Sequence, residues 1–215
     1  MILPALLLTV SAFAEPDFDP ALGAIAPFRA TKMAQPAAPL LTTSKAALEA
    51  MVKELVAAHF DRLPKVPVVI DDSLVSDFDF FQAHVQGYLK DWDKRVYVLK
   101  VNRKLYVDSP GDVALRGILI HELTHLNEYA HSSTFGLAGL GWDYAFTDDN
   151  ADVVKWERAT DENALRLGYA EGVKAYRLWL YSRLTPERVA KKKRVYFTPE
   201  QIDAWVLAHP AKASP

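Results

Sequence analysis

Hydrophobic positions recur with a helical period over most of the chain. Leu48, Val52, Leu55 and Val56 follow Ser44, a good N-cap, and predict an amphipathic helix over about 44–60. A turn at 109–112 with Asp112 as the expected cap predicts a second helix over 113–130. Similar patterns predict helices near 150–167, 169–183, 185–194 and 198–208.

Short β-rich runs lie between the first two helices. Residues 66–70 predict one strand, and 96–101 and 105–107 predict two more, joined near Asn102 and Arg103. The pattern of residues 77–90 is mixed and fits either a helix or an irregular loop. Helix, a few strands and then helices to the end predict an α+β fold, because no βαβ pattern repeats.

The first forty residues differ from the rest. An apolar run over 2–10 precedes Ala12-Phe13-Ala14, a small-x-small cleavage site, although no Lys or Arg precedes the run. We interpret 1–14 as a signal peptide and expect export, to the periplasm or as a secreted protein, after cleavage near Ala14. The Pro- and Ala-rich residues 15–40 predict an arm or linker. Residues 41–210 are then the folded domain.

Composition limits the chemistry that this domain can perform. The 215 residues carry 25 Lys and Arg against 27 Asp and Glu, so the net charge of −2 gives no overall attraction to nucleic acid. No later stretch has about 18 uninterrupted apolar residues, so we expect no transmembrane segment in the mature chain. The absence of cysteine excludes disulfides, thiol nucleophiles and Cys-based metal sites. A metal site must therefore use the six His and the acidic residues.

One motif matches that requirement: His121-Glu122-Leu123-Thr124-His125. Residues four apart share one helix face, so both imidazoles can bind one ion, while Glu122 lies about 100° further round. Zn²⁺ accepts such ligands tetrahedrally, keeps a water in the fourth position and lowers the pKa of that water toward about 7. The motif predicts a zinc site at which Glu122, as general base, takes the proton of the attacking water.

Two residues compete for the role of third protein ligand. His131 stands ten residues after His121, which is the metzincin spacing. Metzincins, however, have Gly at the position of Glu128, and they place a Met turn beneath the metal. The methionines of this chain, Met1, Met33 and Met51, all precede the motif.

Glu157 is the preferred third ligand. With Asp161 it shares a helical stripe that is otherwise apolar, formed by Val154, Ala164 and Leu165. A solvated charged face would not show this pattern. Glu157 can reach the ion, while Asp161, one turn later, can hold a ligand imidazole in place.

The sequence His121-Glu-Leu-Thr-His125, followed by Glu157-x-x-x-Asp161, resembles the gluzincin branch of zinc metallopeptidases, which includes thermolysin and the CAAX-endopeptidase-like families. The resemblance implies zinc bound by His121, His125 and Glu157, and hydrolysis of peptide or protein substrates with Glu122 as base. It also implies a zincin-like fold in which short strands flank the active-site helix. A strand edge would pair with extended substrate, for which the strands in 96–108 are the candidates.

Other assignments stay open at this stage. Tyr129, His131 and Tyr144 are available as oxyanion donors. The connection 131–149 fits a cleft-rim loop or a plain surface connection, and residues 191–194 are best interpreted as a solvated basic helix end. The alternative function is a zincin-like domain that binds a metal or a partner without turnover, which Glu122 argues against. A hydrolase of non-peptide amides is a third reading.

Overall fold

A small mixed sheet forms one side of the protein. The computed structural model describes residues 42–133 and 151–210. Its strands are β1 (Val68–Asp71), β2 (Phe81–Gln86) and β3 (Val96–Val101), in the order β1-β3-β2. β1 runs parallel to β3 and β2 runs antiparallel to it. Within the described residues β3 is therefore central and β2 is an edge strand.

Two expectations for this region are wrong. Residues 77–90 contain the strand β2, in which Phe81, Ala83 and Val85 are more buried than the glutamines and histidine between them. Residues 105–107 belong to the short helix α2 (Lys104–Val107), not to a strand. The side-chain Oδ1 of Asn102 accepts the Lys104 N–H (3.0 Å), and this bond favours a helical turn over a β-hairpin.

The helices carry most of the chain. They are α1 (Lys45–His59), α3 (Asp112–His131), α5 (Ala151–Arg166), α6 (Ala170–Tyr181), α7 (Pro186–Val195) and α8 (Pro199–Ala208). Ser44 caps α1 as expected, since its Oγ accepts the Ala47 N–H. Gly168, with φ of 90°, ends α5 as expected. The predicted α+β class with a helical C-terminal half is confirmed.

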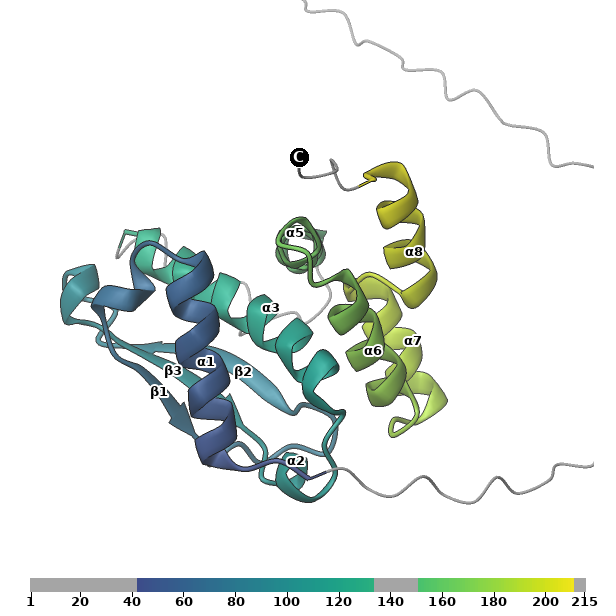
Figure 1. Ribbon diagram of the computed structural model, residues 1–215, viewed down its shortest axis with the longest axis horizontal. Helices are drawn as coiled ribbons and strands as arrows, with labels where there is room; N and C mark the ends of the chain where they lie inside the picture. Colours follow the sequence, from purple (N-terminus) through teal and green to yellow (C-terminus); the bar gives the residue numbers. More distant parts are fainter. Residues whose placement is uncertain (1–41, 134–150, 211–215) are drawn as a thin grey trace, which may run out of the picture. The chain divides into compact units, whose positions relative to one another are not determined.

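α3 lies at the centre of this arrangement (Figure 1). It contacts α1 and the sheet on one side and α5 and α6 on the other, so every residue from Gly117 to Leu126 is buried. Its N-cap is Gly111, with φ of 87°, and Asp112 is the first helical residue rather than the cap. A helix buried all round has no polar face to hold functional groups, so each polar side chain in it requires a partner.

Two arginines fix the C-terminal end of α3. Arg95 donates from Nη1 to the carbonyls of Tyr129 and Ser132, both at 2.9 Å. Arg62 donates to the Ala130 carbonyl at 2.7 Å. These bonds satisfy carbonyls that have no partner within the helix, and they hold its last turn against the strands.

Some predictions concern segments that the structure does not describe. The signal peptide at 1–14, the arm at 15–40 and most of the connection 131–149 lie outside the described residues. Across residues 42–133 and 151–210, none of the helices has the length and apolar character needed to cross a bilayer.

Two glycines allow α3 and α6 to touch through their backbones. A Cβ on Gly117 would lie 2.1 Å from the Gly172 carbonyl carbon and 2.3 Å from the Val173 nitrogen. A Cβ on Gly172 would lie 2.6 Å from the Val113 carbonyl oxygen. These distances are far inside van der Waals contact and involve backbone atoms that cannot rotate away.

We therefore expect Gly117→Ala to lower the free energy of unfolding by about 3 kcal/mol or more, through overpacking. Gly168→Ala is the matched control. Its Cβ would meet no atom within 4 Å, so only backbone strain of about 1–2 kcal/mol is expected. Urea unfolding of both variants measures the difference, and equal losses would contradict the close contact of the two helices.

Candidate metal centre

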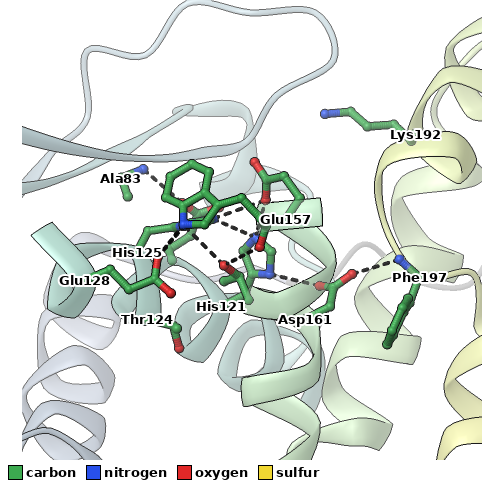
Figure 2. Close-up of polar contacts among 12 residues, drawn as sticks. Ala83, His121, Thr124, His125, Glu128, Glu157, Asp161, Lys192 and Phe197 are labelled. Atoms are coloured by element: carbon green, nitrogen blue, oxygen red, sulfur yellow. Dashed lines mark hydrogen bonds and ion pairs between the residues drawn. The ribbon is translucent and has the colours of Figure 1, made fainter. Parts of the chain in front are cut away.

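His121 and His125 on α3 and Glu157 on α5 converge on one point (Figure 2). The Nε2 atoms of the two histidines lie 3.2 Å apart, and Glu157 Oε2 lies 3.2 Å from Nε2 of His121 and 3.1 Å from that of His125. Tetrahedral ligands at zinc bond lengths of about 2.0–2.2 Å are separated by about 3.3–3.6 Å. The triangle is thus close to the size that this ion requires, and the group can hold a metal ion.

The three side chains are almost inaccessible to solvent, with exposures of 2–4%. Burial favours the neutral acid, yet the two imidazoles outweigh this and hold the pKa of Glu157 well below its usual value. Burial likewise disfavours an imidazolium, but the Glu157 carboxylate outweighs burial and raises the pKa of His125 to about 10. Without metal, the three side chains thus form a buried ion-pair cluster, in which protons on the imidazoles balance the charge of the Glu157 carboxylate.

Asp161 lies one turn after Glu157 and supports the first histidine. Its Oδ1 is 2.9 Å from Nδ1 of His121 and accepts a hydrogen bond from Arg177 Nη2 at 2.8 Å. Its Oδ2 accepts the backbone N–H of Phe197 at 2.9 Å. Burial raises the pKa of this fully buried carboxyl, but Arg177 and His121 more than offset burial, so the pKa lies below its usual value. Asp161 therefore stays ionised and fixes the ring of His121.

On its Nδ1 side, His125 is held mainly by packing, because the nearest carboxylate oxygen there, Glu128 Oε2, is 3.9 Å away. The indole of Trp156 lies 4.2 Å from its ring, centroid to centroid. That indole is fixed in turn, because its Nε1 donates to Glu128 Oε2 at 2.5 Å. Thr160 Oγ1 lies 3.4 Å from Nδ1 of His125. Glu128, which stands at the glycine position of metzincins, therefore anchors the wall of the site.

Glu122 is not part of the ligand triangle, and its carboxylate contacts the sheet. It is 8% exposed, and its Oε2 accepts the backbone N–H of Ala83 on β2 at 2.9 Å. Burial raises its pKa above the usual value for Glu. Glu122 and His121 both line a small cavity of about 40 Å³, which has room for roughly three water molecules.

The far wall of this cavity comes from the helical half. Arg177 and Tyr176 on α6 line it together with Lys192 and Tyr196. Lys192 is not a solvated helix end, since its Nζ lies 2.8 Å from Oδ1 of Asp79 and its side chain is 19% exposed. The prediction that residues 191–194 form a solvated helix end is therefore wrong for Lys192.

The competing ligand candidate lies elsewhere. His131 Nδ1 donates to the Asn127 carbonyl of its own helix (2.8 Å), and its Nε2 lies 3.4 Å from Asp61 Oδ2. It is not part of the group that converges on Glu157. Tyr129 stacks on His125 at 6.5 Å, and Tyr144 lies outside the described residues.

Several groups that line or contact the site were not predicted from the sequence. Arg177 carried a usable signal, because it falls on the apolar stripe of α6 with Val173, Tyr176 and Leu180, as Glu157 and Asp161 do on α5. Trp156 and Tyr196 resemble ordinary core aromatics in sequence. The Ala83 N–H is a backbone group, so the type of residue at this position gives no indication of its contact with Glu122.

None of the protein-family models, curated proteins or solved structures compared with the chain matches it. The case for a metal centre therefore rests on the geometry of the site and on the motif.

Metal binding should release protons. At pH 7 the metal-free group holds at least one imidazole proton, because the pKa of His125 is raised to about 10. Zinc requires neutral imidazole, so we expect about one proton released per ion and an affinity that increases as the pH rises toward 10. Calorimetric titration in buffers of different ionisation enthalpy measures this number. Binding without proton release would contradict the ion-pair description.

The support from Asp161 is expected to strengthen metal binding. Asp161→Asn keeps the size of the side chain but removes the charge facing His121, so zinc affinity should fall about 10–100-fold. Glu162→Gln is the matched control on the same helix, since Glu162 pairs with Arg166 on the exposed side. Competition with a chromophoric chelator gives both affinities, and equal values would show that Asp161 does not support the ligand.

Proposed function

We propose that the protein is a zinc-dependent hydrolase of peptide bonds. His121, His125 and Glu157 would hold the ion and Glu122 would act as general base. The observation that carries the proposal is the buried ligand triangle together with a non-ligand carboxylate, Glu122, which lines the same small cavity as His121. The ligand order resembles that of gluzincins, and by this resemblance we also propose a zincin-like fold. The apolar run at 2–10 with its small-x-small site supports the proposal that the enzyme is exported.

The ion would supply Lewis-acid chemistry, by acidifying water and polarising a carbonyl group. The protein's own residues supply the rest. Glu122 lies against the cavity and is largely shielded from bulk water. Burial raises its pKa above the usual value for Glu, which makes the carboxylate a stronger base. It can take a proton from water in the cavity and return it to the leaving amine.

Substrate would approach along β2 rather than β3. The expected pairing strand in 96–108 is wrong, because β3 has β1 on one side and β2 on the other. Within the described residues, β2 presents the free edge on the side of α3, where Glu122 lies. An extended peptide beside β2 would pass the cavity.

A metal- or partner-binding domain without turnover is the less favoured function. A structural zinc site has four closed protein ligands as a rule, whereas the described residues bring three together. Such a domain would also have no use for Glu122, whose burial costs stability. A non-peptide amide remains an alternative substrate for the same chemistry.

The two functions separate in one set of variants. We expect wild-type protein to bind about one zinc per chain and to cleave members of a peptide library. Glu122→Gln should keep the zinc and lose at least about 100-fold in kcat, because the base is gone. His125→Ala and Glu157→Ala should lose both metal and activity.

Metal analysis and mass-spectrometric detection of the cleaved peptides provide the two measurements. Hydrolysis that survives in Glu122→Gln would exclude Glu122 as the base. A wild-type protein that binds zinc but cleaves no peptide would favour the binding domain.

A further inference from the structure

The carboxylate of Glu122 is bound to the main chain of the sheet. Ala83 on β2 donates its N–H to Glu122 Oε2 at 2.9 Å, across 39 residues of sequence. It is the one hydrogen bond of this side chain among the described residues. Because the Glu122 carboxylate is buried, it requires a hydrogen-bond partner, and the Ala83 N–H provides one.

The register of β2 explains why this N–H is available. In an antiparallel pair, successive residues alternate between pointing their N–H and C=O groups at the partner strand and pointing them away. Ala83 stands opposite Leu99 of β3 and points its N–H away, toward α3. Phe81 and Val85, two residues to either side, share this outward direction. The donor is therefore set by the ladder between β2 and β3.

A backbone donor has a specific advantage for orienting a base. It has no rotamers, so its position is as fixed as the strand that carries it. A bond from N–H to a carboxylate is also shorter and stronger than one between neutral groups. It restrains the side-chain torsions of Glu122, which would otherwise let the carboxylate turn away from the cavity.

We propose that the backbone N–H of Ala83 positions the carboxylate of Glu122 for proton transfer, so that the edge of β2 orients the general base; this inference rests on the proposed function. It has a consequence for substrate. An extended chain beside β2 would find outward N–H groups at Phe81 and Val85, but the one at Ala83 is occupied. The pairing between substrate and β2 would therefore be interrupted at Ala83, whose N–H is bound to Glu122.

The contact can be tested without any measurement of activity. Amide hydrogen exchange of the Ala83 N–H should become about tenfold faster in Glu122→Ala, because its acceptor is removed. The Val85 amide on the same edge should be unchanged. Unchanged exchange at Ala83, or equal acceleration at both amides, would overturn the proposal.

The role in catalysis is tested by removing the donor. Proline lacks the N–H and is tolerated on an edge strand where the N–H faces outward. We expect Ala83→Pro to lower kcat about 10–100-fold, with KM and zinc content close to wild type. Val85→Pro makes the same change on the same edge and face, at an N–H that a paired substrate would use, so it is expected to raise KM rather than to lower kcat. Its kcat should stay within about threefold of wild type.

Equal kcat in the two proline variants would overturn the positioning role while leaving the proposed function intact. Absence of hydrolysis in wild type would instead reject the proposed function, and the exchange measurement would still decide whether the contact exists. If Ala83→Pro does not fold, an amide-to-ester replacement at residue 83 removes the same N–H without the proline ring. The same loss of kcat is expected there.

Discussion

One buried carboxylate, that of Asp161, holds the two halves of the protein in register. It is fully buried, and a charge in such a place is tolerated only where partners surround it. Its partners come from three places in the chain: His121 on α3, Arg177 on α6 and the backbone of Phe197 just before α8. A shift of any one of these elements would remove one of the three partners of this buried charge. The Asp161 carboxylate thus fixes both the positions of these helices and the orientation of the His121 imidazole.

The two sides of α3 contribute different things to the centre. The helical side supplies charged and aromatic side chains, which fix the ligand triangle through Asp161 and Trp156. The sheet supplies a main-chain N–H, which contacts Glu122. α3 itself is rigid, because it is buried all round, capped by arginines at its end and packed against α6 without intervening side chains at Gly117. The candidate metal ligands are therefore fixed from the helical side of α3, and Glu122 is fixed from the sheet side.

Sequence patterns predicted the parts of the structure that depend on side-chain periodicity. The helices followed from apolar spacing and from caps such as Ser44 and Gly168. The three residues of the triangle followed from polar groups on apolar stripes. The strand β2 was missed although Phe81–Gln86 alternates apolar and polar residues, because the run is short and Ala83 has low β-propensity. α2 was mistaken for a strand because its apolar residues favour β-structure, whereas the Asn102 side chain accepts the Lys104 N–H and closes a helical turn. Contacts that use backbone atoms, such as that of Ala83, leave no pattern in the sequence.

The packing of Trp156 on His125 gives the centre an intrinsic optical reporter. The two rings lie 4.2 Å apart, and the indole is held in one orientation by Glu128. Indole fluorescence is quenched by a neighbouring imidazolium far more than by a neutral imidazole. A change in the state of His125, by loss of a proton or by binding of a cation, is therefore converted into a change of light emission within the protein. The occupancy of the site can be followed in real time with no added label, once the four other tryptophans of the chain's five are replaced.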